Sequence, residues 1–204
     1  MSKVVIFPAA AIEEPLALAF VNTLFVEDGA EIDGLSSLKD VDRWCGQVAP
    51  AHANAPLLHA QAAHGLGRLR TLRSTLRSAL EHHVRAQATD ADARSLQNVL
   101  GAGLLAPIFG VADGRVVVEA APQTGTFVDR LIHDIADSFV ALLNDTAPER
   151  IKRCGGDDCV LFFVDRSKAA SRAWCSMRTC GNRHKATVHY RRHHRTDKTK
   201  GNER

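Results

Sequence analysis

The sequence has no long apolar run and none of the features of an exported protein. No stretch approaches the roughly 18 uncharged apolar residues that a membrane-spanning helix needs. The apolar run at residues 4–12 is interrupted by Pro8 and followed at once by Glu13 and Glu14, a flank that secretory signals lack. We therefore expect a soluble, cytoplasmic protein without membrane contact, in which thiols stay reduced.

Recognisable catalytic patterns are also missing. In residues 1–150 no nucleophile–base–orienter set, phosphate-binding loop or acid pair at helical spacing rises above chance. Internal repeats and low-complexity segments are absent as well. We therefore predict a protein that is not an enzyme.

Acidic residues are scarce at one end of the chain. Residues 166–204 hold twelve Lys and Arg against Asp197 and Glu203, whereas residues 1–165 hold fourteen against twenty-one acids. A basic tail on an acidic body is typical of a nucleic-acid contact confined to one end. The alternative is a charged tail that is merely solvated.

Four of the five cysteines form two Cys-x4-Cys pairs separated by fifteen residues: Cys154, Cys159, Cys175 and Cys180. Two local thiolate pairs can complete the tetrahedron that structural zinc requires, so we predict one zinc ion per chain. Two disulfides, or four unrelated core thiols, are the alternatives. Cys45 stands alone and is expected to be a small buried hydrophobe.

The first 150 residues predict a mostly α domain. Residues 15–26 are apolar on every side and indicate a deeply buried helix. Inside it, Asn22 and Thr23 either line a small-molecule pocket or satisfy neighbouring backbone groups. A loop around Gly29 and Gly34 follows, and Asp40 is expected to cap a helix that ends near residue 48.

A long helix is predicted over residues 54–88 from leucines at three- and four-residue steps. They are Leu66, Leu69, Leu72, Leu76 and Leu80. Arginines occupy the other faces, and Gly65 and Gly67 are candidate break points.

Two further helices and a hairpin complete this part. Thr89 with Asp92, and Thr126 with Asp129, resemble capping boxes that open helices ending near residues 100 and 143. Between them, residues 107–111 and 115–119 flank Ala-Asp-Gly and predict a β-hairpin. The fold class is therefore mostly α (α+β), with a regulatory domain at residues 1–148 and a zinc domain at 149–204.

The order of elements around the cysteines predicts a treble clef, in which a knuckle and a hairpin precede a helix that carries the last ligands. Residues 160–164 form an apolar strand and residues 165–171 a polar turn. Phe162, Phe163 and Trp174 are expected to pack beside the metal, with base stacking as the less favoured role. Some treble clefs are nucleases with a catalytic histidine on the hairpin, but residues 160–171 contain none. The four cysteines also leave no open position on zinc for an activated water.

The C-terminal motifs resemble the CGNR zinc-finger family. The matching features are the Cys-x4-Cys knuckle, Asp-Arg-Ser at 165–167, Ser-Arg at 171–172, Trp-Cys-Ser-Met at 174–177 and Cys-Gly-Asn-Arg at 180–183. The segment at 18–24, with Asp33, Leu35 and Trp44, is similar to the N-terminal ABATE domain of these proteins. Ala19 departs from the acidic residue of many relatives. The resemblance implies a bacterial, stress-linked or ligand-responsive transcription regulator.

The basic segment after Cys180 predicts a DNA-binding helix, because its stripes of polar residues leave almost no apolar face to bury. The candidate DNA contacts are Arg183, Lys185, His189, Arg191, Arg192, His194 and Arg195. Arg183 is the first anchor for DNA, or else it supports the zinc thiolates. We expect DNA as the partner and a small-molecule effector for the N-terminal domain; a homodimer is left open. A zinc-stabilised module that docks on an acidic protein is the alternative function.

Overall fold

The chain is mostly helical, as the sequence predicts. The computed structural model describes residues 5–50, 62–101, 108–112, 115–119 and 126–200. Its α-helices are α1 (Ala9–Ile12), α2 (Leu16–Val21), α3 (Leu38–Val48), α4 (Ala62–Val84), α5 (Asp90–Gly101), α6 (Phe127–Asp145) and α7 (Asn182–Lys200). Three antiparallel strand pairs accompany them: β1 (Leu24–Glu27) with β2 (Ala30–Asp33), β3 (Ile108–Ala112) with β4 (Arg115–Glu119), and β5 (Ile151–Arg153) with β6 (Phe162–Val164).

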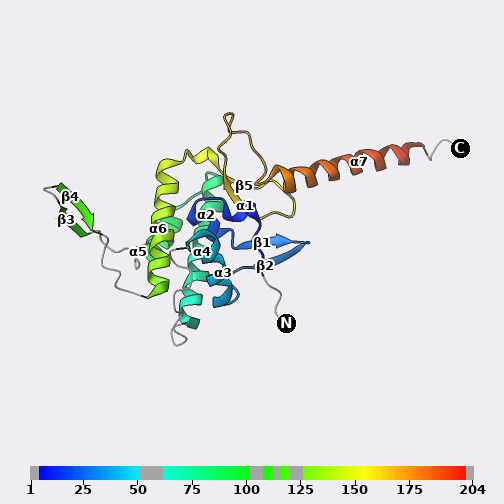
Figure 1. Ribbon diagram of the computed structural model, residues 1–204. Coiled ribbons are helices and arrows are strands. Elements are labelled where there is room, and N and C mark those ends of the chain that lie inside the picture. Colours follow the sequence, from blue (N-terminus) through cyan, green and yellow to red (C-terminus); the bar gives the residue numbers. More distant parts are fainter. Residues whose placement is uncertain (1–4, 51–61, 102–107, 113–114, 120–125, 201–204) are drawn as a thin grey trace.

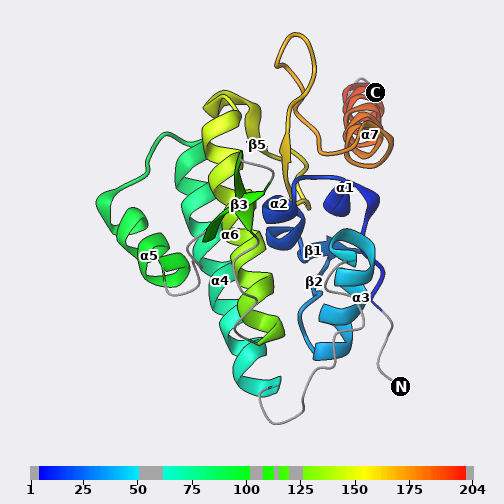
Figure 2. The same ribbon diagram turned by 60° about the vertical axis from the view of Figure 1, so that its left-hand side comes forward.

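The core lies where the short helix α2 packs against the long helices α4 and α6, which also contact each other (Figures 1 and 2). Four of the five predicted leucines of α4, at positions 69, 72, 76 and 80, are at most 1% exposed. The apolar stripe of α6 faces them, and α3 adds Trp44, whose ring meets Phe20 edge-on at 5.6 Å. Ala19, the departure from the family pattern, is buried in this core.

Helix α4 is not broken at its glycines. It runs from Ala62 through Gly65 and Gly67 to Val84. A Cβ on Gly65 would lie 2.7 Å from Cγ2 of Val128, so this glycine allows α6 to approach closely, whereas Gly67 faces open space. Close packing against α6 therefore explains why position 65 is a glycine. The prediction that α4 breaks at Gly65 or Gly67 is wrong. The predicted start near residue 54 lies outside the described residues.

The predicted helix over residues 15–26 is too long. Helix α2 ends at Val21, and the chain then forms the hairpin β1–β2, in which Leu24 pairs with Asp33 and Glu27 with Ala30. The turn residues Asp28 and Gly29 have φ of 51° and 78°. Two positive φ values match the right-handed twist of a two-residue hairpin, and Asp-Gly is a preferred sequence for it. The loop that we predicted around Gly29 is therefore a β-turn.

The capping predictions are partly confirmed. The Thr126 hydroxyl accepts from the backbone of Asp129, whose carboxylate accepts from the Thr126 backbone N–H at 2.7 Å. The Thr126 hydroxyl, and then Arg68, lower the pKa of Asp129 to about 2. Asp92 likewise accepts from the Thr89 backbone N–H at 2.8 Å. The predicted hairpin at β3–β4 is also present.

At α3 the predicted cap is wrong by three residues. Ser37 is the N-cap, and its hydroxyl accepts from the backbone N–H of Asp40. Asp40 occupies the third helical position, where its carboxylate accepts from the hydroxyls of Ser36 and Ser37. These bonds outweigh burial and lower the pKa of Asp40.

The arginines of α4 bind backbone and acidic groups of other elements. Arg73 is buried and donates to Asp33 at 2.6 Å and to the Thr23 hydroxyl at 3.1 Å, which fixes the hairpin β1–β2 against the core. Arg70 donates to the Leu35 carbonyl, and Arg68 to Asp129 on α6. The polar side of the helix is therefore a contact surface.

Helix α7 extends away from the rest of the molecule and carries the C-terminal end of the described chain (Figure 1). Its sequence has no apolar stripe, and most of its described side chains are exposed. Among the described residues, no helix is both long enough and apolar enough to cross a membrane.

Candidate metal centre and nucleic-acid interface

The four paired cysteines come together as the sequence predicts. Their sulfur atoms all lie within 4.8 Å of one another, with Cys175 Sγ at 3.7 Å from Cys159 Sγ and at 3.6 Å from Cys180 Sγ. Zinc–sulfur bonds of about 2.3 Å in a tetrahedron place the sulfurs about 3.8 Å apart. The cluster therefore fits one tetrahedral zinc ion. Cys45 lies elsewhere, in the core, where burial raises its pKa to about 12.

The first pair of cysteines forms the turn of the β5–β6 hairpin. Cys154 follows β5 and donates its backbone N–H to the Leu161 carbonyl at 2.8 Å, while the Cys159 N–H bonds to the Gly156 carbonyl at 3.0 Å. The knuckle therefore lies between two paired strands. We predicted that the hairpin would follow the knuckle, with its turn at 165–171; that order is wrong, because β6 pairs with the upstream segment Ile151–Arg153.

The second pair flanks the beginning of the last helix. Cys175 precedes η4 (Met177–Gly181), a single wide π-helical turn that contains Cys180 and continues into α7. The Ser176 hydroxyl accepts from the Thr179 N–H and caps this turn. The backbone N–H of Cys175 donates to the sulfur of Cys154 at 3.4 Å. Such donors favour the thiolate that a metal requires.

Asp165 organises the segment between the two cysteine pairs. Its fully buried carboxylate accepts from Lys152 Nζ at 2.7 Å, from the Ser167 hydroxyl at 2.6 Å and from the Arg172 N–H at 2.8 Å. These donors, Lys152 first, hold its pKa well below its usual range. The Asp-Arg-Ser motif thus has a structural role, which the sequence alone did not assign.

Arg172 supports the backbone of the second pair. Its guanidinium donates to the carbonyls of Trp174 and Cys175 and lies 4.9 Å from the centre of the Phe163 ring. It therefore fixes the backbone of one ligand while covering an aromatic of the core.

Asn22 joins the N-terminal helices to the zinc module. Its amide donates to the Phe162 carbonyl at 2.8 Å and accepts from the Phe162 N–H at 2.9 Å, and neither side chain has any exposed surface. Asn22 thus bonds the free edge of β6 as a neighbouring strand would. Thr23 is equally buried and donates to the Phe20 carbonyl at 2.7 Å. Of the two roles that we considered for Asn22 and Thr23, these hydrogen bonds agree with satisfying backbone groups, and lining a small-molecule pocket stays a prediction.

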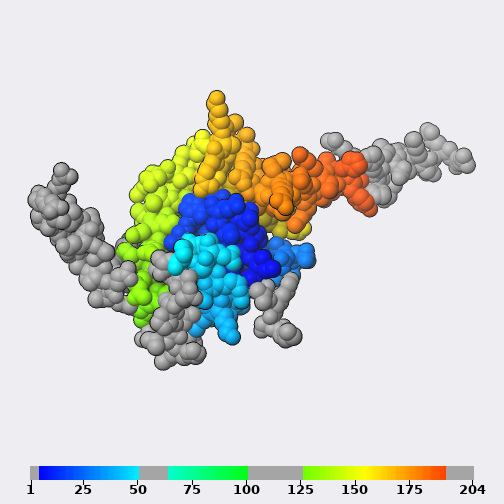
Figure 3. Space-filling model, viewed as in Figure 1, coloured from blue at the N-terminus to red at the C-terminus, as the bar shows by residue number. Residues whose placement is uncertain are grey.

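Four further contacts among the described residues cross the same boundary. Glu14 accepts from the Val164 N–H at 3.1 Å and from Arg166 at 3.3 Å. Arg77 donates to the Val160 carbonyl at 2.9 Å, and Arg153 pairs with Glu81 of α4 at 3.0 Å. The N-terminal residues lie directly against the zinc module, blue against orange in Figure 3.

The three aromatics of the zinc region belong to one hydrophobic cluster, which also includes N-terminal helices. Phe162 and Phe163 are fully buried, and their strand β6 packs against α1 and α2. Trp174 is half-buried and stacks on His184 at 4.7 Å between ring centres. The core of the zinc module is therefore shared with the N-terminal helices.

The predicted DNA contacts lie on α7. Arg183, Lys185, His189 and Arg191 are exposed along its first half. Arg192, His194 and Arg195 fall on its helical backbone, but their side chains lie outside the described part of the chain. Arg183 also lines a cavity of about 40 Å³ beside Cys159 and Cys180, together with Asp157 and Asp158 of the knuckle.

The geometry defines a zinc-finger protein in which a four-cysteine centre anchors a basic helix. Residues 150–193 match the family model described as CGNR zinc finger, and residues 14–146 match ABATE, described as "putative stress-induced transcription regulator". The chain belongs to the ABATE family. A comparison with curated proteins found no match.

Proposed function

We propose that this protein is a DNA-binding transcription regulator in which α7 contacts DNA and the zinc centre fixes its orientation. The observation that carries the proposal is α7 itself. It has no apolar face, projects into solvent and begins at the four-cysteine cluster. A solvated helix anchored at one end has a surface free to enter a groove, where Arg and Lys bind phosphates and guanine edges.

The charges around α7 favour nucleic acid. From Arg166 to Thr196 the sequence contains nine Lys and Arg and no Asp or Glu. The body of the protein is acidic, so phosphate would be repelled there and attracted only at this end. Membership of the ABATE family, which is described as a stress-induced transcription regulator, supports the same conclusion.

We propose a regulatory and non-catalytic role for the N-terminal domain. Its packing against β6 would connect any ligand-induced change in α2 to the metal centre, because Asn22 bonds Phe162 directly. A cytoplasmic location, where thiols remain reduced and available to zinc, belongs to the same proposal.

Docking on an acidic protein is the alternative, since the same basic helix would serve it. DNA binding is tested by selection on random duplexes, followed by titration of the selected duplex at several salt concentrations. Changing Arg183, Lys185, Arg191 and Arg192 together to Ala should flatten the log–log salt slope by about four units at most, since each phosphate neutralised contributes about −0.9.

The matched control is Arg94→Ala, which removes an exposed arginine from α5. It should leave affinity and salt slope unchanged. If the zinc-loaded fourfold variant binds every duplex as well as the parent protein does, α7 does not bind DNA and the acidic-partner function replaces the proposal.

A further inference from the structure

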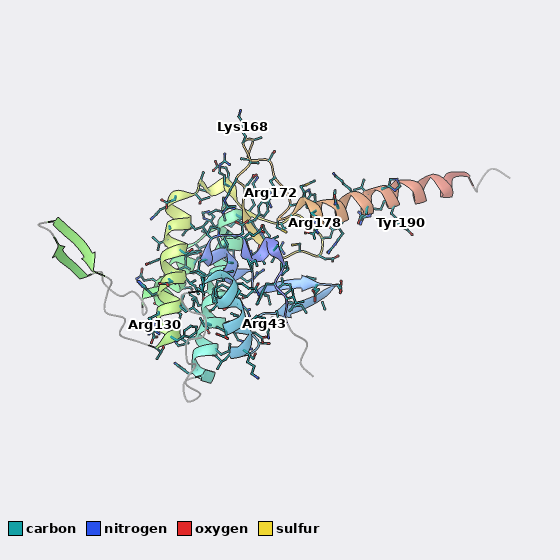
Figure 4. The ribbon with its side chains drawn as sticks, viewed as in Figure 1. Arg43, Arg130, Lys168, Arg172, Arg178 and Tyr190 are labelled. Carbon is teal, nitrogen blue, oxygen red and sulfur yellow. The ribbon has the colours of Figure 1, made fainter. Side chains whose placement is uncertain are left out.

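A second positively charged feature stands beside α7. Residues 165–172, which we call the basic loop, connect β6 to the segment that carries Cys175. The loop projects from the body, with Lys168 at its tip, while Arg172 and Arg178 lie between the tip and α7 (Figure 4). In Figures 1 and 2 the loop rises from the same part of the molecule from which α7 departs.

The base of the basic loop is held rigidly. Lys152 donates to the Ala170 carbonyl at 2.6 Å and to the Arg172 carbonyl at 3.2 Å, in addition to Asp165. Arg150 donates to the carbonyls of Asp165 and Ser167 at 2.8 and 2.9 Å. Both ends of the loop are therefore tied to β5 and the turn before it. A preordered loop loses little conformational entropy when it binds a partner.

The outward charge of the loop is positive. Asp165, its one acid, is fully buried with its carboxylate bonded inside the loop. Arg166 pairs with Glu14 and is partly neutralised. Lys168 is exposed, and in the described part of the chain no hydrogen bond or ion pair engages its ammonium group. The network thus buries the negative charge and presents the lysine.

The position of the loop relative to α7 suits a double helix. A helix in the major groove lies between two phosphate backbones. A rigid arm beside the N-terminal end of such a helix would meet the backbone that borders the groove. A phosphate contact of that kind fixes register without reading sequence.

We propose that the basic loop is a second contact of this protein with DNA, in which Lys168 binds a backbone phosphate next to the groove that α7 occupies. The inference rests on the proposed function, since it requires α7 to be on DNA. The surface in contact with DNA would therefore include the basic loop, which precedes Cys175, and α7, which follows Cys180.

The test uses the full-length, zinc-loaded protein and the duplex selected above. Lys168→Ala should reduce the log–log salt slope by about 0.9, which corresponds to about eightfold weaker binding at 0.1 M salt. The loss should be equal for selected and random duplexes, because the contact is to phosphate. Lys168→Glu should weaken DNA binding more than Lys168→Ala does. Lys39→Ala, which removes an exposed lysine of α3 on the body, is the matched control and should change nothing.

A photo-crosslinking residue at Ala169 gives an independent reading. It should crosslink to the duplex flanking the α7 site, and the same residue placed at Lys39 should not. If Lys168→Ala retains the parent slope and Ala169 does not crosslink, the inference fails, while α7 variants still decide the proposed function separately. If Lys168→Ala weakens capture of an acidic protein but no duplex binds, the loop serves the alternative partner and both proposals for DNA fail.

Discussion

Asn22 should be one of the most sensitive positions in the molecule, although it lies 140 residues from its partner in sequence. Asn22→Ala removes both hydrogen bonds to the backbone of Phe162. The N–H and the carbonyl of Phe162 then stay buried between α2 and β6 without a partner, because β5 occupies the other edge of the strand.

The cost follows from the burial of the groups left behind. An unsatisfied buried backbone donor or acceptor costs about 1–3 kcal/mol, so two of them lower the free energy of unfolding by roughly 2–6 kcal/mol. In a chain of this size each kcal/mol shifts the melting temperature by about 2–4 °C. We expect the melting temperature to fall by about 4–24 °C.

Urea unfolding measures this loss, and the rate of zinc transfer to a chelator shows whether it reaches the metal centre. Phe162 follows Cys159 by three residues, so a loosened β6 should release zinc faster. Asn98→Ala, at an exposed position of α5, is the control and should stay within about 0.5 kcal/mol of the parent protein. An Asn22→Ala protein with parent stability and parent zinc release would refute this reasoning.

Three further predictions concern the metal, the packing and the pH dependence. Cys175→Ser should abolish zinc binding and destabilise the whole chain, because metal binding contributes about 10 kcal/mol or more to folding of such centres; one zinc per chain in the purified variant, by elemental analysis, contradicts this. Gly65→Ala should destabilise by about 1–3 kcal/mol in urea unfolding through its contact with Val128, whereas Gly67→Ala, facing open space, should stabilise by about 1 kcal/mol; equal effects would count against the close packing of α4 and α6. The pKa of Asp129 falls to about 2 on folding, so its contribution is present above pH 4 and is lost as the pH falls toward 2. Between about pH 4 and pH 2 the free energy of unfolding of the parent protein should therefore fall by about 1 kcal/mol more than that of Asp129→Asn. If the two proteins lose stability in parallel over this range, Asp129 does not make this contribution.

The metal centre and the main helices were predictable because their determinants are local. Two cysteine pairs at fixed spacing can close one tetrahedron whatever surrounds them, and leucines every three or four residues indicate a helix face directly. The caps at Thr126 and Thr89 follow for the same reason, since each joins residues three apart.

The hairpin β1–β2 was missed although its signal was present. Asp28-Gly29 is a two-residue hairpin turn, but the apolar residues before it also fit a buried helix. What decides between the two is tertiary: Arg73 of α4 holds Asp33 of the second strand at 2.6 Å. That contact spans 40 residues and has no local pattern.

The partner of Asn22, the backbone of Phe162, could not be predicted for a similar reason. A polar residue in an apolar segment indicates that something will bond it, but not what. The sequence motifs divide the chain near residue 148. The packing shows no such division, because β6 packs against α1 and α2.

The bond between Asn22 and Phe162 also affects how the chain folds as it is synthesised. Helix α2 leaves the ribosome first, and its partner strand follows 140 residues later. At a synthesis rate of about 5–20 residues per second, β6 is made roughly 10–30 s after Asn22. During that time the apolar surface that later covers Phe162 and Phe163 is open. Strand β6, which is made late, therefore closes a part of the fold that is made early, and a chain that ends before β6 should leave this apolar surface uncovered.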